Sequence, residues 1–271
     1  MQKAIQVEWS KTHSEKFDYA KMPLTLDMLK KWIELTDFDD VIQFSIVLTA
    51  MLQFSQLMRI SEILPNSSSN YHFLRTKDVQ FEFSIGLSGK GETFLIPAFQ
   101  ISTACSVNNL IAVHIRLRSA KNDKEGSGFK YTHPNIPCSE KRAYNLAQMM
   151  FKFCLKASPL SDDPFISYEG KSSRRFLNYS KYNSSIKSIA MVCGFEKKNF
   201  SSHSLRIGGT TLLAAAEYPD SYIKKMGRWS SDCYMKYIHF DSISKMKIGK
   251  SLCDPSIFTM SDMRRSNSSA V

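Results

Sequence analysis

The chain has 271 residues, 43% of them hydrophobic and 23% charged, so it can bury the core of one large domain or two modest ones. Its 36 Lys and Arg residues against 25 Asp and Glu give a net charge of +11, which favours a polyanionic partner such as nucleic acid or a membrane surface. The polar N-terminus excludes a signal peptide, and no apolar run is long enough to span a bilayer. A soluble, intracellular protein without a membrane partner is therefore expected.

The cysteines argue against two further classes of protein. All six lie far apart in the sequence and none forms a CxxC pair. This spacing indicates reduced thiols rather than a zinc site or a disulfide framework. No metal site and no cofactor is predicted.

Helical patterns occupy the first part of the chain. Residues 1–21 are charged and weakly periodic, which is typical of an arm or linker. Thr25 is the expected N-cap of a helix whose apolar residues recur at helical spacing. A second, more apolar helix is expected from about Asp39 onward, and the segment RISEIL follows it.

Four short β-rich runs come next, and helical patterns return after them. The runs are DVQFEFSI, ETFLIP, IAVHIRLRS and GFKYTH, and the last two flank AKNDKEGS, which is typical of a hairpin turn. From Ser139 onward most of the chain, including residues 172–195 and 230–240, is expected to be helical, with a flexible tail at 251–271. The predicted fold is mainly α with a small antiparallel β-sheet, of the α+β class.

The segment HSLRIGG has features of a phosphate site. His203 and Arg206 are three residues apart, so they are neighbours on a helix. With Ser202 as N-cap, His203 would lie in the first turn, where free N–H groups and the helix dipole favour an anion. Gly208 and Gly209 each cost a helix about 1 kcal/mol relative to Ala, so a close approach by another backbone or a ligand is expected. A His-x-x-Arg pair also occurs by chance in many helices, and the pattern taken alone favours that interpretation.

Other basic residues also have a structural and a functional interpretation. Arg59 ends the most apolar helical region and needs an anionic neighbour, either Glu62 three residues on or an external phosphate. Lys121 lies at the tip of the expected hairpin, and lysines in such turns are usually only solvated. Lys90 lies in a similar Gly-rich turn and competes with Lys121 for any role.

The order of these residues resembles the tyrosine recombinase/integrase family. RISEIL is similar to the first arginine box of that family, HSLRIGGTTLLA to its His-x-x-Arg box, and MGRWSSDCYMKYI to its final box, where a Gly-His or Gly-Arg-Trp turn precedes a tyrosine. GRWSSD and RSAKND are most similar to the eukaryotic transposon branch, the crypton and DIRS-like recombinases. The resemblance covers about residues 22–245 and implies a tyrosine recombinase catalytic domain over residues 22–250.

The resemblance implies DNA strand cleavage and rejoining, as in site-specific recombination, integration and transposition. In this family a tyrosine hydroxyl attacks a phosphodiester and forms a 3′-phosphotyrosyl link, and the 5′-hydroxyl of a partner strand then reverses the step. The bond energy stays in the intermediate, so neither ATP nor a metal is required. Because the transition state is highly charged, most of the protein's contribution would be electrostatic.

The family's roles carry over to particular residues here. Arg59 and Arg206 would bind the non-bridging oxygens of the phosphate, and Arg228 would supply a further donor. His203 would donate to the phosphate or assist proton transfer from the tyrosine. Lys121 would protonate the leaving 5′-oxygen, as the hairpin lysine is thought to do in relatives.

Spacing within the final box chooses between two tyrosines. In the family the nucleophile follows the second residue of the turn by nine positions, which from Arg228 reaches Tyr237. Tyr234 falls three positions short and is expected to support the site, either by packing or by a contact with the phosphate. Trp229 is expected to pack beneath the site, and a serine directly after it to cap the helix that carries Tyr237 about two turns in.

The resemblance also implies partners. The expected partner is double-stranded DNA, bound by a homotetramer in which the residues after Tyr237 dock onto a neighbouring protomer, in the nucleus if the host is eukaryotic. Many relatives carry an N-terminal core-binding domain that completes a clamp around DNA. Residues 1–21 are too few for such a domain, so a fragment or a reduced element is expected.

Two other interpretations compete with a recombinase. One is a domesticated or truncated DNA-binding protein that keeps the fold and the basic surface but does not cut. The other is a type IB topoisomerase-like enzyme, which shares the chemistry. The HSLRIGG and GRW motifs point away from the topoisomerase.

Overall fold

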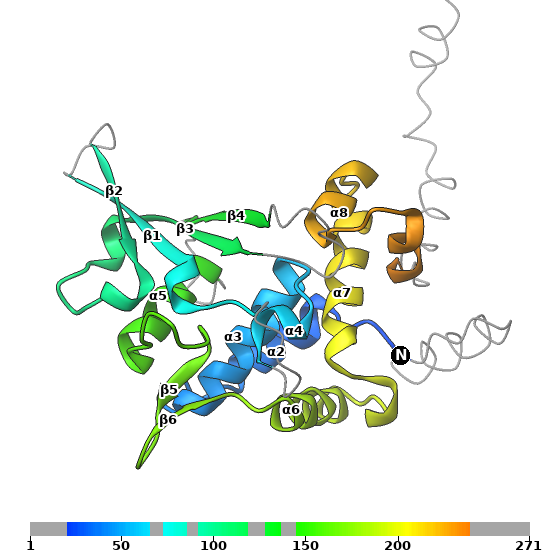
Figure 1. Cartoon of the computed structure of the whole chain (residues 1–271). Helices are drawn as coiled ribbons and strands as arrows, with labels where there is room; N and C mark the ends of the chain where they lie inside the picture. Colours follow the sequence, from blue (N-terminus) through cyan, green and yellow to red (C-terminus); the bar gives the residue numbers. More distant parts are fainter. Residues whose placement is uncertain (1–20, 66–72, 86–91, 119–127, 137–144, 239–271) are drawn as a thin grey trace, which may run out of the picture. The chain divides into compact units, whose positions relative to one another are not determined.

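The computed structural model describes residues 21–65, 73–85, 92–118, 128–136 and 145–238 (Figure 1). The helices are α2 (Leu26–Glu34), α3 (Val41–Ser55), α4 (Ile60–Ile63), α5 (Leu146–Ala157), α6 (Tyr179–Val192), α7 (Ser202–Ala215) and α8 (Asp220–Gly227). The strands are β1 (Val79–Ser84), β2 (Thr93–Pro97), β3 (Leu110–Leu117), β4 (Phe129–Pro134), β5 (Ser167–Glu169) and β6 (Arg174–Phe176). Short 3₁₀ segments are η1 (Thr76–Asp78), η2 (Ala98–Gln100), η3 (Val107–Asn109), η4 (Lys197–Asn199) and η5 (Asp232–Tyr237).

The two N-terminal helices begin where the sequence predicts. The Thr25 hydroxyl caps α2 by accepting a hydrogen bond from the Met28 amide at 3.3 Å. The Asp40 carboxylate caps α3 by accepting one from the Ile42 amide at 2.7 Å. Helix α3 is buried from Phe44 to Phe54, so it forms the centre of the helical core.

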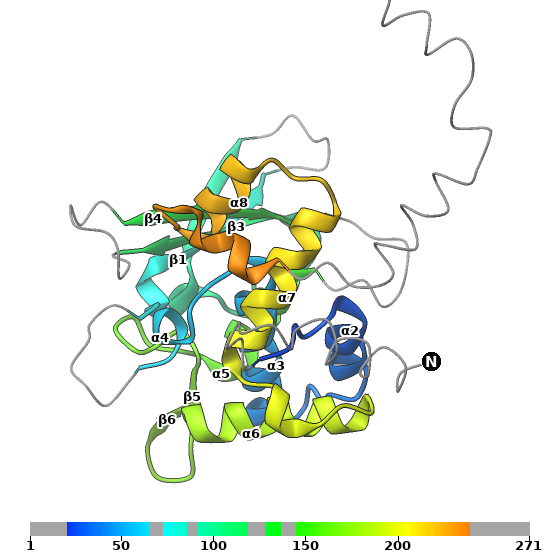
Figure 2. The same cartoon turned by 90° about the vertical axis from the view of Figure 1, so that its right-hand side faces the viewer.

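Helix α7 packs directly on the backbone of the central helix. A Cβ on Gly209 would lie 2.0 Å from the Phe54 carbonyl oxygen of α3, and one on Gly208 would lie 1.8 Å from the Leu24 carbonyl oxygen. The Leu24 amide also donates to the Ser204 carbonyl of α7 at 2.9 Å. The close approach of another backbone, expected from this glycine pair, is confirmed. Seen from the side, α7 runs past α3 towards α8 (Figure 2).

The four predicted strands form one antiparallel sheet in the order β2-β1-β3-β4. Alternate side chains of β1, including Phe81 and Phe83, are buried on one face. Helix α5 covers this face, since the Phe151 ring lies 5.9 Å from the rings of both Phe81 and Phe83. The expected fold class, mainly α with a small antiparallel sheet, is confirmed.

Two parts of the expected helical region differ from the prediction. Residues 174–176 form strand β6, which pairs with β5, and the helix of that region begins only at Tyr179, capped by Asn178. Arg174 bonds Asp163 and Glu169, so contacts outside the local sequence hold the strand in place. The last segment, η5, is a 3₁₀ helix rather than the expected α-helix.

In the described part of the chain, no helix is both long and apolar enough to cross a membrane. Within the same residues, no group of three or more His, Cys, Asp and Glu side chains is placed to hold a metal ion. The described cysteines are free thiols, and Cys154 is buried.

Candidate active site

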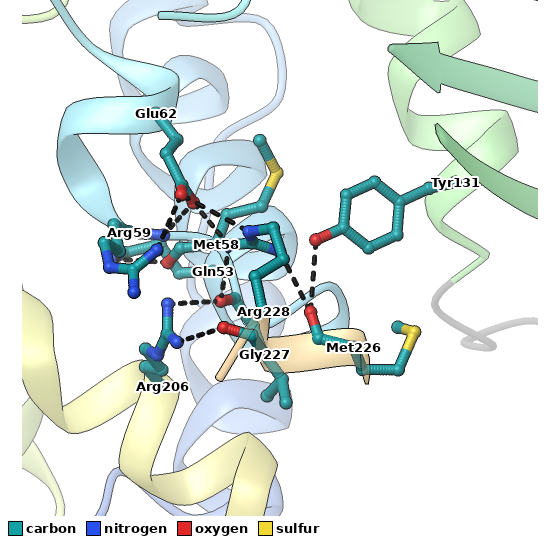
Figure 3. A network of polar contacts seen from close by, with 10 residues as sticks. Gln53, Met58, Arg59, Glu62, Tyr131, Arg206, Met226, Gly227 and Arg228 are labelled. Atoms are coloured by element: carbon teal, nitrogen blue, oxygen red, sulfur yellow. Dashed lines mark hydrogen bonds and ion pairs between the residues drawn. The ribbon is translucent and has the colours of Figure 1, made fainter. Parts of the chain in front are cut away.

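Three arginines from separate segments converge at one place in the helical core (Figure 3). Arg59 precedes α4, Arg206 lies in α7, and Arg228 directly follows α8. Arg206 Nη1 and Arg228 Nη2 donate to the same acceptor, the carbonyl oxygen of Leu57, at 2.9 and 3.2 Å. The loop before α4 is therefore the point where the motifs of the sequence meet.

Buried polar side chains support this loop. Gln53 of α3 donates to the Met58 carbonyl at 3.3 Å, and its own carbonyl oxygen accepts from the Tyr182 hydroxyl at 2.7 Å. Leu57 has a φ of 48°, in the left-handed region that side chains other than glycine adopt at a cost. The surrounding hydrogen bonds therefore hold the Leu57 carbonyl in a fixed direction.

Glu62 is the carboxylate that the cluster shares. It is 3% exposed and accepts from Arg59 twice, from the backbone N–H at 2.6 Å and from Nη1 at 3.0 Å. It also accepts from Nε and Nη2 of Arg228. The pairing of Arg59 with Glu62 is confirmed, whereas the sequence did not predict that Arg228 would also bond Glu62. Among the described residues, Glu62 is the only carboxylate that bonds any of the three guanidinium groups, so the cluster carries excess positive charge.

Arg206 is held at its edges and lacks a partner at Nε. Its side chain donates to the carbonyls of Leu57 and Gly227, while Nε is buried and has no hydrogen-bond partner among the described residues. Burial, together with the charge of Arg59, lowers the pKa of Arg206 to about 10, so the guanidinium stays charged at neutral pH. A buried cation with an unused donor is a strong site for an anion.

Arg228 is committed to the protein rather than open to a ligand. Its side chain is 6% exposed and bonds Glu62, the Leu57 carbonyl and, at 2.9 Å, the Met226 carbonyl. Burial lowers its pKa, although Glu62 opposes this effect. Arg228 was expected to donate a further hydrogen bond to a phosphate. It would have to do so with N–H groups that these bonds leave free.

His203 and Tyr237 lie next to each other at the open side of the cluster. Their ring centroids are 4.8 Å apart, and the guanidinium carbon of Arg206 lies 5.8 Å from the Tyr237 ring. Ser201, not Ser202, is the N-cap of α7, and it accepts from the His203 amide at 3.3 Å. This shift of the N-cap by one residue is of the size by which assigned helix ends commonly differ, and it leaves His203 in the first turn, as expected.

The electrostatics of His203 favour its neutral form. Partial desolvation, followed by the charges of Arg206 and Arg59, holds its pKa below the usual value of 6.5. The His203 side chain is nevertheless exposed to solvent. A neutral imidazole in this position can accept a proton from a neighbouring hydroxyl group.

The two tyrosines of the final motif have different surroundings. Tyr234 is 1% exposed, and its hydrogen bond to Asp220 together with desolvation raises its pKa to about 12. Tyr237 is half-buried and lies beside His203. The ring of Tyr234 is thus packed inside the fold, and its hydroxyl already has a partner in Asp220.

Strand β4 reaches the same cluster. The rings of Phe129 and Tyr131 lie 6.0 and 5.6 Å from the Arg228 guanidinium carbon, and the Tyr131 hydroxyl donates to the Met226 carbonyl at 3.2 Å. Sequence reasoning missed these contacts, because nothing in the FKYTHP pattern distinguishes them from ordinary strand packing. Lys121 and Lys90 lie outside the described residues.

Solved structures match this chain at the level of the fold. XerH site-specific recombinase, bound to palindromic difH substrate in a post-cleavage complex, matches with 16% identity and a TM-score of 0.53, over 85% of this chain and 53% of that chain. XerA recombinase matches with 16% identity and a TM-score of 0.49, over 85% of this chain and 64% of that chain. Tn1549 transposon integrase with circular intermediate DNA matches with 14% identity and a TM-score of 0.42, over 88% and 68%.

The XerH match confirms the recombinase catalytic-domain fold that the sequence predicts. This chain spans about half the length of the XerH chains that it matches. A scan against protein-family models finds no match, and a search of curated proteins finds none either.

Proposed function

We propose that this protein cleaves and rejoins DNA strands through a covalent 3′-phosphotyrosyl intermediate, with Tyr237 as the nucleophile. The observation that carries the proposal is the position of Tyr237, half-buried beside His203 and 5.8 Å from the Arg206 guanidinium. A nucleophilic hydroxyl, a proton acceptor and a fixed cation are the three groups that attack on a phosphodiester needs. The fold shared with XerH supports the same assignment.

Cleavage would proceed as an in-line displacement. The Tyr237 oxygen attacks phosphorus while His203 takes its proton, and the bond from phosphorus to the 5′-oxygen breaks. Lys121 donates a proton to that oxygen, which leaves as a 5′-hydroxyl. Rejoining reverses each transfer: a 5′-hydroxyl attacks the phosphotyrosine, returns a proton to Lys121, and Tyr237 regains its own.

The arginines would stabilise the charge that develops on the non-bridging oxygens. Arg206 has a buried Nε without a partner, and Arg59 keeps donors beyond the one that bonds Glu62. Arg228 would act mainly by fixing Glu62 and the Leu57 carbonyl. A preorganised set of this kind requires little rearrangement when the phosphate arrives.

Double-stranded DNA is the proposed partner. The net charge of +11 suits a duplex, whose counterions are released as lysine and arginine side chains contact phosphates. A homotetramer on two duplexes, an origin in a transposable element of the crypton or DIRS type, and a nuclear location in a eukaryotic host belong to the same proposal. Binding should weaken steeply as the salt concentration rises.

A DNA-binding protein without cleavage activity is the second candidate. It is favoured by the burial of Arg228, whose side chain is 6% exposed and already bonded to protein acceptors. A site with one arginine withdrawn would still bind phosphate through Arg206 and Arg59.

Covalent trapping separates the two candidates. Nicked duplexes tiled across the DNA that flanks the gene would lose a short 5′-hydroxyl fragment after cleavage, so the covalent complex would accumulate. We expect a protein–DNA band that survives denaturation, disappears in Tyr237→Phe and persists in Tyr234→Phe. Binding of these duplexes without any such band would support the second candidate. Loss of the band in Tyr234→Phe alone would assign the nucleophile to Tyr234.

A further inference from the structure

We propose that Trp229 is a positioning residue, which fixes the Arg206 guanidinium and the Tyr237 ring relative to each other. Its importance for strand cleavage rests on the proposed function, whereas its effect on the geometry does not. Trp229 itself would touch neither the phosphate nor the transferred proton.

The indole of Trp229 lies between the two groups that it would position. The Arg206 guanidinium carbon lies 4.2 Å from the centre of the indole, and the Tyr237 ring centroid lies 5.0 Å from it. Trp229 is 7% exposed, so water does not screen the contact with the cation. The indole thus packs against both the proposed nucleophile and the arginine that is proposed to bind the phosphate.

The indole supplies the contact that the hydrogen bonds of Arg206 leave out. Carbonyl oxygens of Leu57 and Gly227 hold two edges of the guanidinium, and Nε has no partner in the part of the chain that the structure describes. Edge bonds alone fix the plane of the group poorly, because a guanidinium can tilt about them. An aromatic face stacked on the cation restricts this tilt and directs the unused Nε donor.

The backbone turn at the end of α8 holds the indole in place. Arg228 has a φ of 55°, and the Trp229 amide donates to the Lys224 carbonyl at 2.9 Å, which closes the helix and turns the chain back. A Cβ on Gly227 would lie only 1.7 Å from the indole, so only glycine admits the ring there. Gly227 also provides the carbonyl that accepts from Arg206. One turn therefore sets both an edge contact and the face contact of the same guanidinium.

The first test compares two buried tryptophans in DNA cleavage. Trp229→Phe and Trp229→Leu are measured against Trp32→Phe, since Trp32 is 8% exposed and stacks on Tyr182 at 6.5 Å, among the helices of the core. The readouts are the single-turnover rate of adduct formation at saturating nicked duplex, and the affinity for that duplex. A displacement of about 1 Å in such a site slows reaction roughly 100-fold. We expect that loss for Trp229→Leu, a smaller one for Trp229→Phe, and affinities within about twofold of wild type.

Thermal unfolding separates positioning from stability. Trp32→Phe should lower the melting temperature as much as Trp229→Phe does and leave the cleavage rate of the folded protein unchanged. Equal rates for Trp229→Leu and the wild-type protein would overturn the proposal. So would a parallel loss of rate in Trp32→Phe, because the effect would then follow stability alone.

The second test needs no cleavage activity. The protein contains three tryptophans, so labelling with 5-fluorotryptophan gives fluorine resonances that the Trp→Phe variants assign. Arg206→Lys and Tyr237→Leu should each shift the Trp229 resonance and leave that of Trp32 unchanged. If the wild-type protein forms no covalent adduct but these shifts occur, the proposed function fails and the positioning role of Trp229 stands. A Trp229 resonance that responds to neither variant would overturn the inference, whatever the activity.

Discussion

Arg228 donates two hydrogen bonds to Glu62, although 166 residues separate them in the chain. Both side chains are buried, with exposed fractions of 6% and 4%. The pair joins the end of α8, which precedes the proposed nucleophile, to the start of α4, which carries Arg59. The pair therefore connects the last motif, MGRWSSDCYMKYI, to the first motif, RISEIL.

Removal of Glu62 should destabilise the protein strongly. Glu62→Ala leaves the guanidinium of Arg228 buried without its counter-ion, which costs about 3–5 kcal/mol when one partner of a buried pair is lost. Glu62→Gln keeps part of the hydrogen bonding and should lose less. The free energy of unfolding in urea measures both variants. Glu196→Gln is the control, since its pair with Lys198 is exposed at 55% and 77% and should change stability by less than about 1 kcal/mol.

The hydrogen bonds of the Arg228 side chain should stabilise the protein by more than its left-handed backbone conformation destabilises it. Its φ of 55° lies in the region that a residue with a Cβ adopts at a cost of about 1–2 kcal/mol. Arg228→Ala keeps that cost and loses the bonds to Glu62, whereas Arg228→Gly loses only the bonds. We expect both variants to be less stable than wild type in urea unfolding, with Gly about 1 kcal/mol better than Ala. An alanine variant as stable as wild type would show that the network contributes nothing to stability.

Local chemistry explains which parts of the fold could be predicted from the sequence. The starts of α2 and α3 depend on Thr25 and Asp40, whose side chains bond amides two or three residues away. The strands of the four-stranded sheet could be predicted because their runs are rich in residues that favour strands. Strand β6 does not, because it is three residues long and is held by Arg174 contacts to Asp163 and Glu169.

The sequence could bring attention to the residues that meet in the described part of the candidate site, but it could not predict the contacts between them. Arg59 and Glu62 are three residues apart, so their pairing could be read from the chain. The hydrogen bonds from Arg228 to Glu62 and the stacking of Trp229 on Arg206 depend on how α4, α7 and α8 pack together. Whether Tyr237 would lie in an α-helix or in a 3₁₀ helix also depended on this packing, because a six-residue segment has little helical preference of its own.

Gly208→Ala should destabilise the protein although alanine is the better helix former. The new Cβ would lie 1.8 Å from the Leu24 carbonyl oxygen, a backbone atom that no side-chain rotation can move. Overpacking of this kind costs about 1–3 kcal/mol, which exceeds or cancels the gain of about 1 kcal/mol in helix propensity. Ser184→Ala, at an exposed position of α6, is the control that shows the gain in helix propensity. Equal stabilisation by both changes would contradict the close packing of α7.

Tyr234 should make folding sensitive to alkaline pH. Its pKa is raised to about 12 by the hydrogen bond to Asp220, by desolvation and by nearby negative charge. The folded state thus holds the phenolic proton more tightly than the unfolded state, where the pKa is about 10. This contribution is complete below pH 10 and is lost as the pH rises from about 10 to 12. The free energy of unfolding should fall more steeply across this pH range for wild type than for Tyr234→Phe, and equal slopes would contradict the hydrogen bond to Asp220.

Binding of DNA at the proposed site should take up a proton at His203. In the free protein, desolvation and the charges of Arg206 and Arg59 lower its pKa from 6.5, so the ring is neutral at and above that pH. A phosphate placed beside it offsets those charges and raises the pKa, so protons are bound together with DNA at and just below pH 6.5. Calorimetry of duplex binding in buffers with different ionisation enthalpies counts these protons, with Tyr237→Phe used to prevent cleavage.

The histidine of β4 provides the matched control for this measurement. Burial also lowers the pKa of His133, but its ring bonds Gln56 at 3.1 Å and none of its contacts reach the arginine cluster among the described residues. His203→Gln should abolish proton uptake, and His133→Gln should leave it unchanged. Uptake that persists in His203→Gln and disappears in His133→Gln would mean that the phosphate lies against β4, away from Arg206 and Tyr237. The DNA-binding face would then be the one that carries Lys130 and Lys225, which line the same surface hollow as His133.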